Sequence, residues 1–390
     1  MFSPNRRRPC TCNIDCLLTV RRKEKLKVDC PRRELNEAVS MACLATGVRS
    51  PLTLFQNLKL SSTNGQLKVL GCDGEMWIER TLACSTSEAG AALLPAKVLA
   101  ELTKQLPDGD VNLTWQGNQV TISEGDSVYQ LMALDAEDFP EPPNTQTDSE
   151  LTIGMGAFKE AVDSVLFAVS SDAHRQALTG VYFSYDGSTL MLVATDTHRL
   201  AVRKLDHGGI GGQFTAIVPE KAIRAIKALS IPDLDNLTIR FGGNRLTVET
   251  SGTKIVSLLY DGPYPNWQRV VPSEHTRVWS VETDKLREVV NRARIVAKDS
   301  ANRVRFSGAE DKIVLLARGE QGEANEVVDA VMQNGTVDMA FNGQYVQEAL
   351  GPIKGPGVRI EITESTRPAV FRSADDTDSY FCVIMPMALA

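Results

Sequence analysis

The chain has 390 residues, a hydrophobic content of 43% and a formal net charge of −7, an ordinary composition for a globular protein. It contains no run of about 18 apolar residues, so we expect no membrane-spanning helix. Its basic start lacks the apolar segment of a secretory signal. The eight cysteines follow no disulfide framework, which favours reduced thiols in a cytosolic protein.

The first 25 residues differ in character from the rest. They hold seven basic and two acidic residues, although the whole chain is acidic. Cys10, Cys12 and Cys16 suggest a metal site, but C-x-C-x3-C lacks the C-x2-C spacing of zinc sites. We expect no metal here and interpret residues 1–25 as a basic, disordered extension. A misassigned start codon explains the segment as well.

From residue 26 onward, one pattern recurs three times. Similar runs begin at Leu93, Ile217 and Ala340, and each reads as a strand end, a helix, a Pro/Gly break and alternating strands. The helices open at Pro95, Pro219 and Asn342, which are 124 and 123 residues apart. Solenoid repeats are much shorter, about 20–50 residues. The spacing therefore predicts three whole domains of one design.

The first half of each unit repeats as well. Helical stretches at 31–45, 156–170 and 283–298 each precede a hairpin, at 58–79, 181–202 and 304–325. Asn64-Gly65 and Asp186-Gly187 suit type I′ turns, whose central residues need positive φ. Each unit then has two helices packed on antiparallel sheets, and the fold class is α+β with three similar domains. The expected boundaries are 1–25 for the extension and 26–148, 149–273 and 274–390 for the domains.

Basic residues form stripes on two of the predicted helices. Lys221, Arg224 and Lys227 recur every third residue, and Arg287, Arg294 and Lys298 share one face of the helix at 283–298. A solvated face is the ordinary explanation of such a stripe. Contact with nucleic-acid phosphates is the functional alternative, and an acidic chain makes it selective rather than indiscriminate.

The obvious catalytic candidate is the pair Asp196 and His198. Asp-x-His could bind a metal or transfer protons, which defines a hydrolase hypothesis. The chain has only four histidines, and the equivalent Asp73 is followed by Gly-Glu-Met instead. Asp196 is better interpreted as a turn residue that accepts local backbone N–H groups. The sequence thus favours a protein without catalysis.

Three segments, taken in order, resemble those of one family. VATDTHRLAV at 193–202 looks like the ATDGHRLA segment of bacterial DNA polymerase III beta subunits, the sliding clamps. YPNWQRVVP at 264–272 is similar to their FPDYRRVIP segment, and VIMPMALA at 383–390 resembles their terminal MPMRL. The resemblance covers about residues 26–390. It implies the DNA-clamp architecture, a ring-shaped head-to-tail dimer with twelve helices around a hole for duplex DNA.

The resemblance also implies a function and partners. The chain would be a non-enzymatic processivity factor, without cofactor or metal, that encircles duplex DNA of any sequence. It would tether the DNA polymerase III catalytic subunit, the clamp loader, and other polymerases and repair proteins through short linear motifs. Its second copy would be a partner, a membrane would not, and its place would be the bacterial cytoplasm, at the nucleoid.

The family's functional residues map onto matching positions here. The motif pocket between the second and third domains corresponds to Leu178, Thr195, His198, Arg199, Leu200, Pro265, Arg269, Val270, Val383, Met385, Pro386 and Met387. The DNA-facing residues would be Arg49 and, from the basic stripes, Lys221, Arg224, Arg294 and Lys298. The dimer contact would join Tyr129 and Leu131 of one chain to Ile295 and Val296 of the other.

The chain departs from the family pattern in three places. Thr197 replaces the usual Gly, so the turn there has less backbone freedom. The terminus ends in Ala388-Leu389-Ala390 instead of Arg-Leu, and residues 1–25 have no counterpart. Two alternatives remain at this point: a metal-dependent hydrolase using Asp196 and His198, and a monomeric three-domain scaffold.

Overall fold

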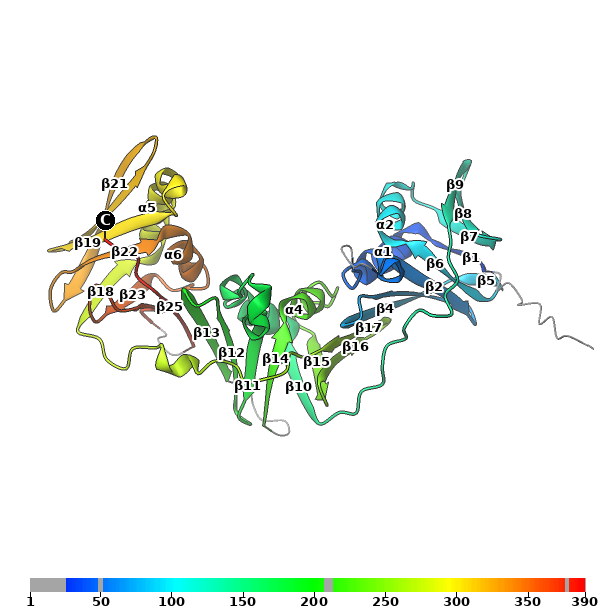
Figure 1. The fold of residues 1–390 in the computed structure, drawn as a ribbon, viewed down its shortest axis with the longest axis horizontal. Helices are drawn as coiled ribbons and strands as arrows, with labels where there is room; N and C mark the ends of the chain where they lie inside the picture. Colours follow the sequence, from blue (N-terminus) through cyan, green and yellow to red (C-terminus); the bar gives the residue numbers. More distant parts are fainter. Residues whose placement is uncertain (1–25, 48–51, 207–212, 376–378, 390) are drawn as a thin grey trace, which may run out of the picture.

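A computed structural model describes residues 26–47, 52–206, 213–375 and 379–389. The basic extension at 1–25, with its three cysteines, and Arg49 lie outside these residues. The described elements form three similar domains, arranged one after another along an arc (Figure 1). Each domain contributes two α-helices, and the prediction of an α+β fold with three repeated units is confirmed.

The six α-helices of the described residues start where the sequence predicts. Pro95 and Pro219 occupy the N-cap positions of the second and fourth helices, and at the sixth the Asn342 side chain accepts the backbone N–H groups of Gln344 and Tyr345. The bounds are α1 Arg32–Cys43, α2 Ala96–Gln105, α3 Met155–Asp163, α4 Glu220–Lys227, α5 Thr283–Val296 and α6 Gly343–Leu350.

The helix predicted at 156–170 is shorter than expected. It ends at Asp163, and the chain continues as a short 3-10 turn, Leu166–Ala168. The Ser164 hydroxyl donates to the Glu160 carbonyl at 2.7 Å, a local bond that competes with helix continuation.

The strands follow the same order in every domain. The first domain holds β1 Lys27–Pro31, β2 Asn57–Thr63, β3 Gln66–Cys72, β4 Met76–Ala83, β5 Ser85–Glu88, β6 Gly90–Pro95, β7 Asp110–Gln116, β8 Gln119–Glu124 and β9 Ser127–Met132. The second holds β10 Ser149–Gly154, β11 Gly180–Tyr185, β12 Thr189–Thr195, β13 Arg199–Asp206, β14 Phe214–Pro219, β15 Asn236–Gly242, β16 Arg245–Thr250 and β17 Thr253–Leu258. The third holds β18 Arg277–Glu282, β19 Arg303–Ala309, β20 Lys312–Gly319, β21 Gly322–Gln333, β22 Asp338–Asn342, β23 Gly357–Ile362, β24 Ala369–Ser373 and β25 Tyr380–Ile384.

Of the two predicted type I′ turns, one is confirmed and one is wrong. Asn64 and Gly65 have φ values of 53° and 76°, as a type I′ turn requires. In the Asp186-Gly187 turn of the second domain, only Gly187 has a positive φ. The Asp186 carboxylate instead accepts the backbone N–H groups of Ser188 and Thr189, which holds the turn in another geometry.

Two sheets run across domain junctions. Strand β17 of the second domain pairs antiparallel with β4 of the first, and β25 of the third pairs antiparallel with β13 of the second. In both ladders equivalent residues meet: Trp77 faces Val256, and Leu200 faces Val383. The strand β9 lies at the free edge of the first domain's five-stranded sheet. The chain is therefore built head to tail, with one joining pattern used twice.

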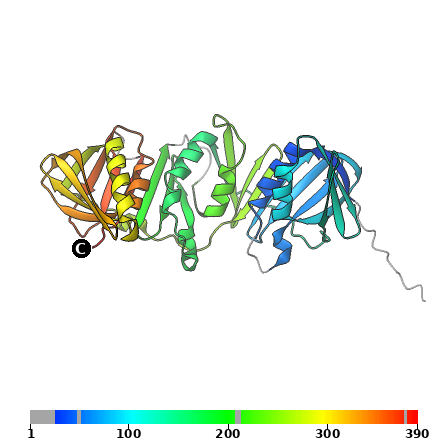
Figure 2. The same cartoon turned by 90° about the horizontal axis from the view of Figure 1, so that it is seen from above.

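The helices lie on the concave side of the arc, and the sheets lie behind them (Figures 1 and 2). One apolar core runs through the second and third domains and takes in Met76 and Ile78 of the first. A second core, with Leu35, Leu58 and Leu113, belongs to the first domain. The apolar side of each helix packs on these cores, so its polar side faces the hollow of the arc.

Candidate functional site

A cavity of about 210 Å³ opens at the junction of the second and third domains. It is lined by Leu178, Thr195, Thr197, Arg199, Leu200, Pro265, Asn266, Trp267, Val270, Val383 and Met385. These residues come from the turn before β11, from β12 and β13, from the linker between the domains and from the end of β25. The cavity thus exists only because the two domains are joined.

Most of the predicted pocket residues meet in this cavity. Leu178, Thr195, Arg199, Leu200, Pro265, Val270, Val383 and Met385 all line it. Four others lie outside its lining: His198 and Arg269 are exposed nearby, and Pro386 and Met387 follow the strand end. The backbone N–H of Met387 donates to Ala340 at 2.7 Å, which carries the tail away along β22.

The sequence comparison did not assign Thr197, Asn266 and Trp267 to the lining, and the structure adds them. Trp267 is buried, with 8% of its surface exposed, beside Leu200 and Val383. Its place inside the YPNWQRVVP segment is the signal that could have identified it, because a buried aromatic ring commonly walls an apolar cleft.

The cavity is apolar inside and partly open at its rim. Leu200 and Val383 are buried and face each other across the β13–β25 ladder. Val270 and Met385 are large apolar residues that remain exposed. Such a combination suits an apolar side chain that enters from solvent, and the flexible thioether of Met385 can adapt to its shape.

Arg199 is the one strongly charged group in the lining, and it is held from several sides. Its Nε donates to Asp196 at 3.1 Å, one terminal nitrogen donates to Glu348 and the other to the carbonyl of Phe167. The guanidinium carbon also lies 4.2 Å from the ring centroid of Tyr345. Because Glu348 and Tyr345 belong to the third domain, Arg199 joins the two domains.

The hydrolase hypothesis is not supported by the surroundings of Asp196. One carboxylate oxygen accepts the backbone N–H groups of His198 and Arg199 at 2.9 and 3.0 Å, and the other accepts from the Arg199 side chain. Asp196 is thus the turn residue that its position predicts. In the described part of the chain, no group of three or more His, Cys, Asp and Glu side chains could hold a metal.

Two basic residues of the concave side, Arg224 and Arg294, are already engaged with neighbours. Arg224 donates to Glu220 on the same helix, and Arg294 donates to Asn291 and Gln344. Lys298 is exposed just beyond α5. An anion that binds to Arg224 or Arg294 must compete with the existing partners of that residue, so the expected attraction is modest.

Lys221 has a structural role that its sequence position does not reveal. Its ammonium forms an ion pair with Asp73, so it links α4 of the second domain to the β3–β4 turn of the first. Burial lowers the pKa of Lys221 to about 8, and the charge interaction with Cys72 opposes this shift only in part.

The four predicted dimer residues lie at the two ends of the arc. Tyr129 and Leu131 belong to the edge strand β9, and Ile295 and Val296 end α5 at the far domain. Ile295 is 68% exposed and Tyr129 is 38% exposed, both unusual for large apolar side chains. Among the described residues, each end of the arc therefore carries exposed apolar side chains.

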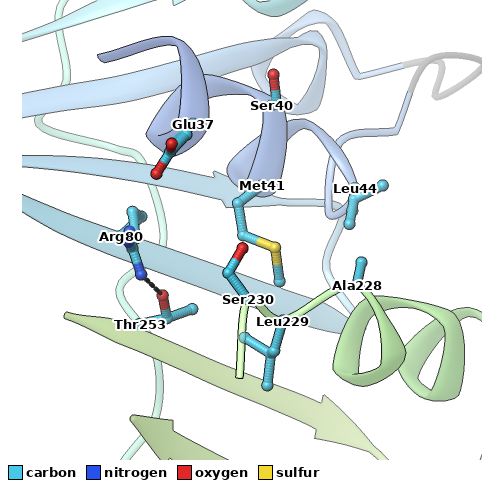
Figure 3. A pocket seen from close by; sticks show the side chains of 9 residues that line it. All are labelled: Glu37, Ser40, Met41, Leu44, Arg80, Ala228, Leu229, Ser230 and Thr253. Carbon is cyan, nitrogen blue, oxygen red and sulfur yellow. Dashed lines mark hydrogen bonds between the residues drawn. The ribbon is translucent and has the colours of Figure 1, made fainter. Parts of the chain in front are cut away.

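A second cavity, of about 280 Å³, lies on the helical side of the junction between the first and second domains (Figure 3). Met41 and Leu44 at the end of α1 face Leu229, which follows α4. Arg80 donates to the Thr253 hydroxyl at 2.7 Å at its floor. This cavity lies between the ends of two helices, whereas the cavity of about 210 Å³ lies beside the β13–β25 ladder.

Comparison with known proteins agrees with the three-domain fold. The profile of the DNA polymerase III beta subunit matches in three parts: its N-terminal domain at residues 26–143, its central domain at 152–266 and its C-terminal domain at 268–388. A beta sliding clamp from Vibrio cholerae is 27% identical over 368 residues, covering 93% of this chain and all of that protein. One from Staphylococcus aureus is 28% identical over 355 residues, covering 88% and 94%.

Solved structures give the same result. A DnaN sliding clamp (DNA polymerase III subunit beta) from Pseudomonas aeruginosa, bound to griselimycin, superposes with a TM-score of 0.85 at 26% identity and covers 93% of this chain and all of its own. The sliding clamp from Bacillus subtilis has the same fold, with a TM-score of 0.87 at 23% identity over 94% of this chain and all of its own. The chain belongs to the DNA polymerase III beta subunit family, the bacterial sliding clamps, which are non-catalytic processivity factors of DNA polymerase.

Proposed function

We propose that two copies of this chain close head to tail into a ring around duplex DNA. The ring would tether partner proteins through the cavity of about 210 Å³ between the second and third domains, called the Leu200 cavity from here on. The observation that carries this proposal is the repeated domain junction. The same strand pair joins the first domain to the second and the second to the third. A third use of this pair, between two copies, gives a closed ring of six domains.

The two strands needed for the third junction have free edges. The equivalent of β4 and β13 is the first part of β21, which pairs with β20 on one side. Its other side has no ladder partner within the described residues up to Asp329. The equivalent of β17 and β25 is β9, the edge strand of its sheet. Pairing β21 with β9 of a second copy removes both exposed edges, which otherwise invite aggregation.

The internal ladders also predict the register of this third junction. Three bridges mark equivalent positions: Leu134, Tyr260 and Met387. The residues four positions before these bridges are, in the same order, Gln130, Val256 and Val383. Val256 faces Trp77, and Val383 faces Leu200. Glu323 is the equivalent of Trp77 and Leu200 in β21, since each follows its hairpin at a spacing of 123 residues. Gln130 of one copy should therefore face Glu323 of the other.

The concave surface suits a DNA duplex that passes through without sequence recognition. Arg224, Arg294 and Lys298 come from helices on the concave side, and phosphate contacts carry no sequence information. Because Arg224 and Arg294 already have protein partners, each phosphate contact is weak and exchangeable. The ring then stays on DNA by enclosing it, and Arg49 would add a contact of the same kind.

The cavity suits a short linear motif with apolar anchors. Leu178, Leu200 and Val383 form a buried floor, and Val270 and Met385 form an exposed rim. Motif-bearing partners would be the DNA polymerase III catalytic subunit, the clamp loader, other polymerases and repair proteins. The protein would work in the bacterial cytoplasm at the nucleoid.

Engineered cysteines at the predicted register test the ring. The double variant Gln130→Cys with Glu323→Cys should form covalent dimers on oxidation, of twice the 42.6 kDa chain mass. Each single variant controls for the native thiols. The pair Gln130→Cys with Ala324→Cys is the matched control, because a shift of one residue moves a side chain to the other sheet face. Equal crosslinking by both pairs, or monomers throughout as a monomeric scaffold requires, would contradict the proposed junction.

A further inference from the structure

Strand β1 and the start of β5 bring two thiols of the first domain opposite each other. In the β1–β5 ladder, Asp29 faces Ser85. The next pair along the two strands is therefore Cys30 and Cys84. We propose that these two cysteines are an oxidisable pair, which a small disulfide oxidant converts into a covalent bond between β1 and the start of β5. The inference goes beyond the proposed ring and does not depend on it.

The backbone places the two thiols at the closer of the two kinds of antiparallel position. The Cys84 N–H donates to the Gly65 carbonyl at 2.9 Å, and so it does not bond to β1. Cys30 and Cys84 therefore face each other without exchanging backbone hydrogen bonds. In such pairs the Cα atoms are typically about 4.5 Å apart and the side chains are closest. Disulfides span Cα separations of about 4.4–6.8 Å, so the bond can form with little movement of either strand.

Both side chains lie on the core side of the first domain, but they differ in access. Cys30 is 1% exposed and belongs to the core, whereas Cys84 is partly buried and packs against the same core. Burial above all, with added effects of Cys84, Asp29, Glu34 and Asp110, raises the pKa of Cys30 to about 12. Because the thiolate is the nucleophile, Cys30 is a poor first attacker. The more accessible Cys84 should therefore react first with an oxidant.

The thiol at position 30 is particular to the first domain. The residue two positions before the first helix of each domain is Cys30, Ile153 or Val281, and all three are buried. The core needs only an apolar side chain at this position, a role that a free cysteine can also fill. The second cysteine across the ladder is what distinguishes Cys30 from such a core residue, because two facing thiols can form a bond.

The bond forms in two exchange steps through a mixed disulfide. The Cys84 thiolate attacks one sulfur of oxidised glutathione, and one glutathione thiolate leaves. Cys30 then loses its proton to solvent and attacks Cys84 Sγ, and the second glutathione leaves as a thiolate. The two protein thiols lose two electrons and two protons in total, and the oxidant is reduced to two thiols. Since Cys30 is the buried partner, the second step should be the slower one.

The bond would fasten a weakly held strand. Strand β5 is the edge strand of its sheet, and its ladder with β1 has a register shift after Lys27. Cys30 and Cys84 are 54 positions apart, and the chain between them includes α1 and the strands β2, β3 and β4. Closing this loop restricts the unfolded chain, which stabilises the folded state. Oxidation should therefore stabilise the first domain, and reduction should reverse the effect.

Peptide mapping of the oxidised full-length protein tests the pair. Folded protein is incubated with oxidised glutathione, its remaining thiols are alkylated, and it is then unfolded and digested with trypsin without reduction. Trypsin releases Cys30 in residues 28–32 and Cys84 in residues 81–97, and mass spectrometry detects the linked peptides. Cys43→Ala is the matched control, because Cys43 packs against the same core but its thiol donates to a backbone carbonyl of another segment.

We expect the linked peptides from wild-type protein and from Cys43→Ala. The two single variants of the pair should differ: Cys30→Ala should keep glutathione on Cys84, and Cys84→Ala should leave Cys30 as a free thiol. Oxidised wild-type protein should unfold at a higher temperature than reduced protein, dithiothreitol should reverse this shift, and Cys30→Ala should lack it. The inference is overturned if folded wild-type protein gives no linked peptides, or if Cys30 links to Cys43 instead of Cys84. Neither result would affect the proposed ring.

Discussion

At the junction of the first two domains, Trp77 faces Val256 across the β4–β17 ladder; at the next junction, Leu200 faces Val383 across the β13–β25 ladder. Trp77 is buried with Phe139 of the first linker in one apolar cluster. Leu200 is a much smaller side chain, and its junction contains the cavity of about 210 Å³. One backbone plan thus places a Trp side chain in the first joining ladder and leaves an apolar cavity beside the second.

The two junctions also differ at two further pairs of equivalent positions. Gly74 and Thr197 stand 123 residues apart in equivalent turns and both have positive φ, 95° and 76°. Met76 and Arg199 are likewise equivalent, and only Arg199 supplies the charged link to the next domain. The two junctions therefore differ in a few side chains at equivalent positions, while the backbone pairing is the same.

Removal of the C-terminal residues should have the largest effect on peptide binding at the junction of the second and third domains. Deletion of residues 385–390 removes Met385 from the cavity rim and the Met387 bond to Ala340. Peptide binding and polymerase stimulation should then be lost, whereas the dimer should remain because its strands lie elsewhere. Fluorescence polarisation and light scattering measure the two properties. Full-strength peptide binding by the shortened chain would refute the pocket.

Polar substitution at the chain-to-chain junction should have the next largest effect. Ile295→Asp with Val296→Asp places two charges where we expect apolar contact with β9 of a second copy. Each lost aliphatic contact costs roughly 1–5 kcal/mol, depending on burial, and a buried unpaired charge adds to that cost. Light scattering should show folded monomers that still bind peptide. A dimer that survives both substitutions would remove these residues from the interface.

Exchange of the two facing residues tests the comparison itself. Leu200→Trp should fill the cleft as Trp77 fills the first junction, and weaken peptide binding about tenfold or more, which corresponds to 1.4 kcal/mol or more. The reciprocal Trp77→Leu should leave peptide binding unchanged and lower the free energy of unfolding by about 2–4 kcal/mol, because it leaves a cavity. If Leu200→Trp binds peptide normally, the cleft is not the site.

The smallest effect concerns the turn at Thr197. A β-branched residue at positive φ destabilises the folded state by about 1–3 kcal/mol of strain. Gly removes this strain but favours the unfolded chain by roughly 0.5–1 kcal/mol through its larger conformational entropy. Thr197→Gly should therefore raise the free energy of unfolding by about 1 kcal/mol in a urea titration. Gly74→Thr is the mirror control and should lower it. Stabilisation by both variants would show that strain at this turn is not the cause.

Much of this molecule could be predicted from sequence. The period of 123–124 residues revealed three domains, and short motifs placed Leu200, Val383 and Met385 in one cleft. The end of α3 was missed because it depends on a local bond of Ser164 rather than on periodicity. Two ion pairs were missed because their partners are far apart in sequence: Lys221 and Asp73 by 148 positions, and Arg199 and Glu348 by 149. Nothing local in the sequence marks such a partner.

The retention of a closed ring on circular DNA tests the central claim most directly. The Gln130→Cys with Glu323→Cys protein is mixed with nicked circular plasmid at low salt, oxidised, and then passed over a gel-filtration column in about 1 M salt, where phosphate contacts are screened. The account predicts that crosslinked protein remains with the circle, and that it is released when a restriction enzyme linearises the plasmid. A linear duplex with blocked ends should retain it again. Equal retention on open linear and circular DNA, or release from both, would contradict a ring that encloses the duplex.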